Sequence, residues 1–111
     1  MNRSKLLIFA ALFGFSSLCM AETWKNASFV DVNCSAKVKD NPDAHKRNCA
    51  LQCSKSGYGI FTADGTFLKF DAKGNEQALN TLKAAQSDDH LRVTVTGDRD
   101  GDTIKVKSLS M

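Results

Sequence analysis

The segment "GYGIFTADGTFLKFD", residues 57–71, carries the clearest structural signal in the chain. Two apolar runs flank Asp64-Gly65, which predicts a β-hairpin with a two-residue type I′ turn, because that turn needs positive φ at both central residues. With this turn, Phe61 faces Leu68 across the hairpin. The face assigned to the core holds Phe61, Leu68 and Phe70. The opposite face holds Tyr58, Ile60 and Phe67.

Three further segments are predicted strands. "TWKNASFVDVNC", residues 23–34, alternates toward its end and predicts a long first strand. "HLRVTVTG", residues 90–97, and "DTIKVKSL", residues 102–109, alternate with period two and form a second hairpin across a polar turn. Their core-facing side chains are expected to be Leu91, Val93, Val95, Ile104 and Val106.

Two helices are predicted. "NPDAHKRNCALQCS", residues 41–54, begins with Asn41 as an N-cap and Pro42 at the first helical position, and Asp43 suits the positive end of the helix dipole. Gly57 is a natural stop.

The second predicted helix covers "GNEQALNTLKAAQ", residues 74–86, and is capped by Asn75. Ala78, Leu79 and Leu82 form its apolar stripe.

This order of elements predicts a mainly β fold with two helices. Five short strands with a helix between the third and fourth match a five-stranded OB-fold-like barrel. The helix between the first and second strands is then an insertion. An α+β sandwich is the alternative that uses the same elements.

The first 21 residues are expected to be a signal peptide. Arg3 and Lys5 precede an apolar run that is shorter than the roughly 20 residues of a membrane span, and Ala21 is the expected last residue removed. Residues 22–111 would then be a single domain in the periplasm or outside the cell. A lipid anchor on Cys19 is an alternative.

Charge gives little indication of a partner. The chain has 15 basic and 12 acidic residues, and losing Arg3 and Lys5 lowers the net charge from +3 to 13 − 12 = +1. A domain this close to neutral has no general electrostatic case for binding nucleic acid. The candidate partners that remain are a periplasmic protein and a small ligand. Basic residues cluster around the first predicted helix: Lys37, Lys39, Lys46, Arg47 and Lys55.

The cysteines left after cleavage are Cys34, Cys49 and Cys53, and three interpretations are open. In the first, Cys34 pairs with Cys49 or Cys53 in a disulfide that contributes roughly 3 kcal/mol, and one thiol remains. In the second, they are ligands of zinc or copper together with His45 and Asp31. In the third, they form a redox-active or intermolecular thiol.

Helix geometry limits the metal interpretation. On an unbroken helix His45 and Cys53 are roughly 12 Å apart, so one ion cannot reach both easily. Either His45 with Cys49, or Cys49 with Cys53, would share the ion, and Cys34 would be a third ligand. Without a metal, His45 is expected on the surface.

Other chemistry has weaker signals. Trp24, Tyr58 and Phe67 are candidate stacking platforms for a sugar or a single strand of nucleic acid. No phosphate loop, carboxylate pair or Ser-His-Asp set stands out. The sequence therefore predicts a non-enzymatic exported domain without a cofactor, which binds an unknown ligand and is stabilised by a disulfide. The alternative is a periplasmic metal-binding or thiol-redox protein.

Four segments carry a resemblance: "DVNC" (31–34), "HKRNCALQCSKSGYGIF" (45–61), "DGTFLKFD" (64–71) and "VTVTGDRDGDTIKV" (93–106). Together they resemble a group of small exported bacterial domains of unknown function that is described as OB-fold-like. The resemblance covers nearly all of the predicted mature chain. It implies the fold and export, and it implies no catalytic residue.

Overall fold

The computed structural model describes residues 21–111. The predicted signal peptide and the lipid-anchor alternative at Cys19 lie outside the described residues, apart from Ala21.

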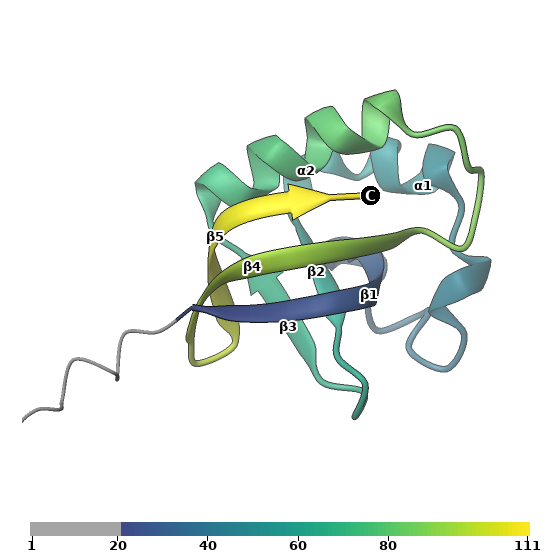
Figure 1. Ribbon diagram of the computed structural model, residues 1–111. Helices are drawn as coiled ribbons and strands as arrows, with labels where there is room; N and C mark the ends of the chain where they lie inside the picture. Colours follow the sequence, from purple (N-terminus) through teal and green to yellow (C-terminus); the bar gives the residue numbers. More distant parts are fainter. Residues whose placement is uncertain (1–20) are drawn as a thin grey trace, which may run out of the picture.

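Residues 22–111 form a closed barrel of five strands in the order β1-β2-β3-β5-β4 (Figure 1). The strands are β1 (Glu22–Asp31), β2 (Tyr58–Phe61), β3 (Phe67–Phe70), β4 (Arg92–Asp100) and β5 (Thr103–Ser110). Neighbouring strands are antiparallel, except that β3 and β5 run parallel. This barrel confirms the predicted fold class, a mainly β, OB-fold-like barrel with two helices.

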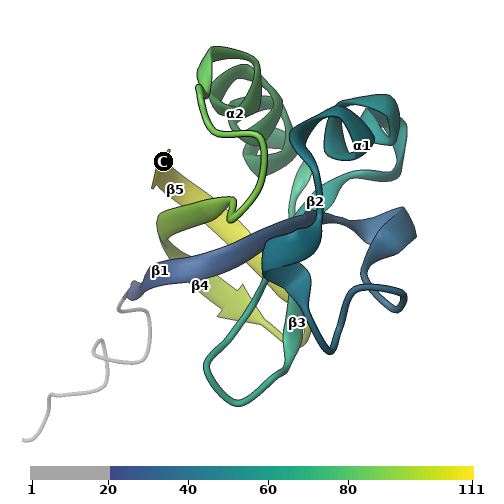
Figure 2. The same cartoon turned by 90° about the vertical axis from the view of Figure 1, so that its right-hand side faces the viewer.

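The helices lie on one side of the barrel (Figure 2). Helix α2 (Ala72–Ala84) connects β3 to β4, and helix α1 (Arg47–Gln52) lies in the insertion between β1 and β2. The insertion also contains three 3₁₀ turns: η3 (Val32–Cys34), η4 (Pro42–Ala44) and η5 (Ser54–Ser56). Within residues 21–111, no helix combines the length and the apolar character that crossing a membrane requires.

Helix α2 begins before the predicted cap. The side chain of Asp71 accepts a hydrogen bond from the Gly74 N–H at 2.9 Å and is the N-cap. Asn75 instead joins the helix to the barrel, because its Oδ1 accepts from the Tyr58 N–H at 2.8 Å. The predicted apolar stripe is confirmed, with Ala78 and Leu82 buried.

The β2–β3 hairpin has a longer loop than predicted. The Thr62 N–H donates to the Thr66 carbonyl at 2.8 Å, so three residues lie between these two. Gly65 is the last of the three and has φ of 87°, and its N–H donates to the Thr62 carbonyl. A type I turn followed by a left-handed glycine gives this three-residue loop, which accommodates Asp-Gly as well as the two-residue loop does.

The longer loop shifts the hairpin register by one residue. Ile60, not Phe61, faces Leu68. Because alternate residues point to opposite faces, Tyr58 and Ile60 enter the core, and Phe61 packs on the outer face against Phe67, with ring centroids 5.2 Å apart. The predicted faces of β2 were therefore wrong, whereas the predicted core residues of β3 are buried.

Aromatic rings and branched side chains fill the barrel. Phe29 stacks on Tyr58 with ring centroids 5.0 Å apart. The inward-facing residues predicted for the last two strands are all buried: Leu91, Val93, Val95, Ile104 and Val106. The period-two pattern thus identified this half of the core correctly.

The predicted helix over residues 41–54 is broken. The side chain of Asn41 makes no capping hydrogen bond, η4 ends at Ala44, and His45 is extended, with φ of −70° and ψ of 127°. The cause is a contact with β4, because the Asp43 carboxylate accepts two hydrogen bonds from the Arg92 guanidinium, at 2.7 and 2.8 Å. This pairing also lowers the pKa of Asp43. Tertiary contacts thus override the local helix signals.

Candidate metal centre

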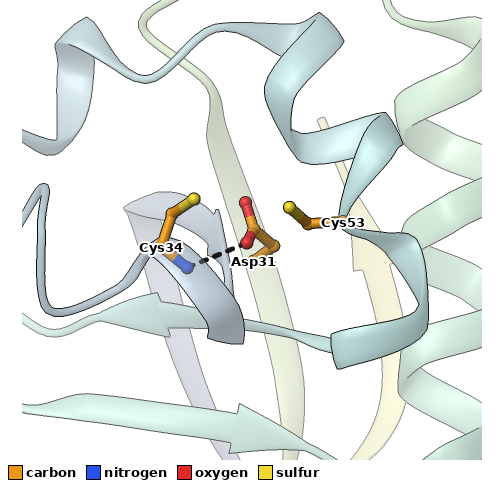
Figure 3. A group of neighbouring side chains, drawn as sticks. All are labelled: Asp31, Cys34 and Cys53. Carbon is orange, nitrogen blue, oxygen red and sulfur yellow. Dashed lines mark hydrogen bonds between the residues drawn. The ribbon is translucent and has the colours of Figure 1, made fainter.

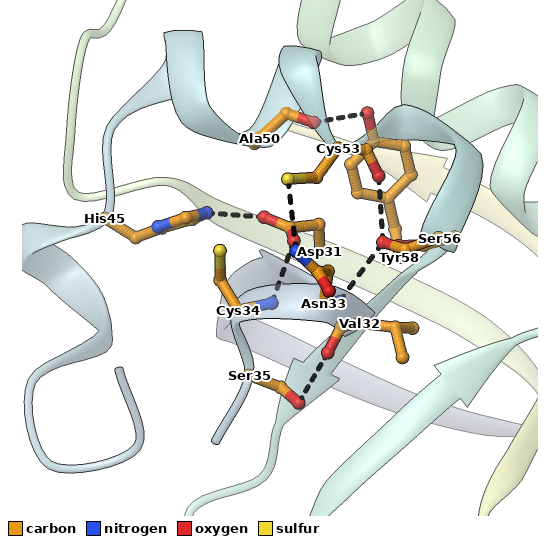
Figure 4. A network of polar contacts seen from close by, with 11 residues as sticks. Asp31, Val32, Asn33, Cys34, Ser35, His45, Ala50, Cys53, Ser56 and Tyr58 are labelled. Atoms are coloured by element: carbon orange, nitrogen blue, oxygen red, sulfur yellow. Dashed lines mark hydrogen bonds and ion pairs between the residues drawn. The ribbon is translucent and has the colours of Figure 1, made fainter. Parts of the chain in front are cut away.

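Asp31 is the centre of a polar cluster at the end of β1 (Figure 4). Its side chain is fully buried, yet both carboxylate oxygens have partners. Oδ2 accepts from the Cys34 N–H at 2.9 Å and so caps η3, and Oδ1 lies 2.6 Å from Nε2 of His45. These contacts hold the carboxylate in one orientation.

His45 is buried, with 6% of its surface exposed, so the prediction of a surface histidine was wrong. The extended backbone at His45 directs the imidazole back toward Asp31 (Figure 4). Nε2 of His45 and Oδ1 of Asp31 thus share one hydrogen bond in the interior. A buried carboxylate is costly without such a partner, which explains why the ring is drawn inward.

Two thiols flank the Asp31 carboxylate (Figure 3). Cys34 ends η3, and Cys53 is the C-cap residue of α1. One carboxylate oxygen and the two sulfur atoms all lie within 4.8 Å of one another. The Asn33 side chain donates a long hydrogen bond of 3.6 Å to the Cys53 sulfur. Three potential ligand atoms therefore converge on one point between β1 and α1.

Two further contacts fix the Cys53 end of α1. The Tyr58 hydroxyl donates to the carbonyl of Ala50 at 2.8 Å in the interior. The Ser56 hydroxyl donates to the Cys53 carbonyl at 2.8 Å and accepts from the Asn33 N–H at 3.1 Å. Helix α1 is thus held against both the barrel and η3, although it has only six residues.

The local electrostatics disfavour a thiolate when no cation is present. Burial raises the pKa of the Cys34 thiol to about 11, and the negative charge of Asp31 and the nearby Cys53 act in the same direction. Cys34 is therefore a neutral thiol at pH 7 in the metal-free protein. A bound cation reverses this preference, because metals bind the deprotonated sulfur.

The spacing of the three atoms approaches that of a metal site. In a tetrahedral zinc site with Zn–S of about 2.3 Å and Zn–O of about 2.0 Å, ligand atoms lie roughly 3.3–3.8 Å apart. The three atoms here lie within 4.8 Å of one another, so each pair exceeds that spacing by at most about 1 Å, which a change of side-chain rotamer can close.

The structure brings together four of the five predicted metal ligands: Asp31, Cys34, His45 and Cys53. The predicted limit on one ion reaching both His45 and Cys53 assumed an unbroken helix, and the break at His45 removes that assumption; His45 contacts Asp31 but is not one of the three converging ligand atoms. Cys49 is exposed and lines a surface depression with Lys46, Asn48 and Asp88, outside this group. The predicted sharing of an ion through Cys49 is therefore not what the structure supports.

No disulfide links the cysteines of residues 21–111, so the predicted disulfide stays a prediction. All three cysteines among the described residues are free thiols. Cys34 and Cys53 are 4.3 Å apart, about twice the S–S bond length of roughly 2.05 Å. Of the two pairings predicted for Cys34, the one with Cys53 is the nearer to this geometry.

The three predicted stacking residues do not form one surface. Tyr58 is fully buried in the core and cannot stack on a ligand. Phe67 is half-buried against Phe61. Trp24 is partly exposed and lines a groove of about 500 Å³ together with Phe61 and Arg92.

Asn33 and Ser56 belong to the site but were missed in the sequence. The spacing Asp31-x-x-Cys34 is that of a side chain capping a backbone N–H three residues later, and this is a local signal for η3, the turn that carries Asn33. No sequence signal identifies Ser56, because its partners are set by the meeting of η3 with η5.

Comparisons with known protein families, with curated proteins and with solved structures found no match to this chain. The chemistry of the site is therefore the basis for assigning a function.

Proposed function

We propose that this chain is a small exported protein that binds a thiophilic metal ion, zinc or copper(I), through Cys34, Cys53 and Asp31. The observation that carries the proposal is the convergence of two sulfurs and a buried carboxylate oxygen within 4.8 Å. His45 would serve as the outer partner that orients the carboxylate, a role that side chains around ligating carboxylates commonly have.

Charge balance supports a divalent ion at this site. Two thiolates and one carboxylate carry three negative charges, and a divalent cation leaves one. His45, whose Nε2 lies 2.6 Å from Oδ1 of Asp31, is the side chain that faces this remaining charge. Sulfur donors select zinc or copper(I) over magnesium and calcium, and the added oxygen donor favours zinc.

The state of the thiols favours binding over thiol catalysis. A catalytic cysteine usually has a lowered pKa and is partly thiolate at neutral pH. The pKa of Cys34 is instead raised to about 11. We therefore propose a protein that holds or delivers a metal, not a thiol enzyme.

Metal titration of the reduced protein tests this proposal. We expect about one equivalent of zinc, and thiolate-to-metal charge-transfer bands when cobalt(II) replaces it. Cys34→Ser and Cys53→Ser should each abolish these bands. The matched control is Cys49→Ser, which changes an exposed thiol on the same helix and should leave the stoichiometry unchanged. A reduced protein that binds no zinc or copper(I), or one that needs Cys49, contradicts the proposal.

The groove beside Trp24 favours a second candidate function, the binding of a small polar ligand such as an oligosaccharide. Its lining combines the aromatic side chains of Trp24 and Phe61 with several polar groups, a combination typical of ligand sites. Soluble oligosaccharides should then quench the Trp24 fluorescence, and Trp24 is the only tryptophan in the chain. An unchanged emission spectrum at millimolar sugar would exclude this candidate.

A further inference from the structure

We infer that the same pair of thiols forms a disulfide, Cys34–Cys53, whose formation expels the metal, so that the site is controlled by oxidation. The inference deepens the proposed function and rests on it for the metal-bound state. Cys34 and Cys53 would therefore be either metal ligands or a disulfide, and never both at once.

The geometry identifies the pair. Cys34 and Cys53 are 4.3 Å apart and flank Asp31, and they come from two short elements that meet there, η3 and the end of α1 (Figure 3). A disulfide needs the sulfurs at about 2.05 Å, so they must approach by roughly 2 Å. Rotation about the Cα–Cβ bonds produces shifts of this size without displacing the strands.

Cys49 is not part of this pair. It is exposed and lies one helical turn before Cys53. Cysteines four residues apart on a helix aim their Cβ atoms poorly for a bond. Oxidation should therefore leave Cys49 as the free thiol.

The chemistry requires an external oxidant, and a small-molecule disulfide is the natural class in an oxidising compartment. One protein sulfur, as its thiolate, attacks the reagent and forms a mixed disulfide, releasing one reagent thiolate. The second protein sulfur then attacks the first, and a second reagent thiolate leaves. The protein loses two protons and two electrons, and the reagent gains both as two thiols.

The disulfide and the metal cannot coexist at this site. A metal ligand must be a thiolate, and a disulfide sulfur carries no such charge. Oxidation thus removes two donors and leaves only Asp31 and His45, which already bond to each other at 2.6 Å. In the other direction, a bound metal holds both sulfurs and protects them from the oxidant.

The test uses the full-length mature protein, loaded with zinc and then treated with oxidised glutathione. We expect zinc release, measured with a colorimetric chelator, to follow the loss of two hydrogens from the intact mass. Peptide mapping should find the Cys34–Cys53 link, and a reductant should restore the original zinc capacity. Cys49→Ser should behave like the parent, which shows that the third thiol takes no part.

The outcomes separate this inference from the proposed function. If the reduced protein binds zinc but the oxidised protein keeps it, or if the link involves Cys49, the inference is wrong and the metal site stands. If the reduced protein binds no metal, the proposed function fails, and the inference fails with it. A second variant, Asp31→Asn, should weaken zinc binding while the disulfide still forms, because it removes a metal ligand and neither sulfur.

Discussion

The two helices of this protein are stabilised in different ways. Helix α2 has 13 residues, a capping side chain in Asp71 and an apolar stripe, so its own sequence accounts for it. Helix α1 has six residues and no side-chain cap, and Ala50 is its only buried residue. Contacts from outside hold α1, chiefly the Tyr58 hydroxyl on the Ala50 carbonyl. The insertion that carries the thiols is thus shaped by a buried polar cluster, whereas the rest of the domain is shaped by apolar packing.

The largest expected loss of stability follows from a substitution in the polar cluster around Asp31. Asp31→Ala removes the cap of η3 and leaves the His45 ring buried without its partner. Breaking a buried pair in this way costs about 3–5 kcal/mol, measured as the free energy of unfolding in urea. Asp40→Ala, at an exposed position of the same insertion, is the control and should change stability by less than about 0.5 kcal/mol. Equal losses in the two variants would mean that the cluster does not stabilise the insertion.

Metal binding should have the next largest effect on the stability of the protein. Free zinc at 100 times its dissociation constant should stabilise the reduced protein by about 2.7 kcal/mol. Cys34→Ser should lose this gain and Cys49→Ser should keep it, and thermal unfolding with and without zinc measures both. Stabilisation of both variants by zinc would place the metal elsewhere.

Removing the hydrogen bond that anchors α1 should lower stability by a smaller amount. Tyr58→Phe removes one buried hydrogen bond and should lower the free energy of unfolding by about 0.5–1.5 kcal/mol. Amide hydrogen exchange should accelerate in α1 and remain slow in α2, because α2 has its own cap. Uniform acceleration across both helices would show that they are a single cooperative unit.

The effect that is smallest near neutral pH concerns the titration of Cys34 in the metal-free, reduced protein. The pKa of Cys34 is raised from 9.0 to about 11, so the folded state retains a proton that the unfolded state loses. Stability should therefore fall as the pH rises from about 9 to 11. Tyr58, whose pKa is raised to about 12, contributes in the same direction above pH 10. Comparing Cys34→Ser with Cys49→Ser in urea isolates the Cys34 share, which is absent if the two slopes agree.

The apolar part of the fold was predictable because its signals are local. The alternation in β4 and β5 and the stripe on α2 each need only neighbouring residues. The register of the β2–β3 hairpin was not predictable, because Asp64-Gly65 fits both a two-residue and a three-residue loop. A change of one residue there exchanged the faces of Ile60 and Phe61.

The site was predicted in its members but not in its geometry. The residue types and spacing pointed to Asp31, Cys34, His45, Cys49 and Cys53, and Cys49 belonged to both pairs that were expected to share the ion. The break in the helix at His45 depends on Arg92, which is 49 residues from Asp43 in the chain. Helix signals within residues 41–54 carry no information about such a distant partner, so His45 was expected on the surface.

The pairing of Asp43 with Arg92 also sets an order of events during folding. The residues just before β4 hold the insertion through two backbone hydrogen bonds, from the Arg47 N–H to the Asp88 carbonyl and from the His90 N–H to the Asp43 carbonyl. A growing chain that ends before residue 88 already contains all four residues of the cluster but lacks the contacts that aim His45. Because closing a loop of this length costs chain entropy, we expect both thiols to stay accessible to other thiols until residues 88–92 have joined the insertion.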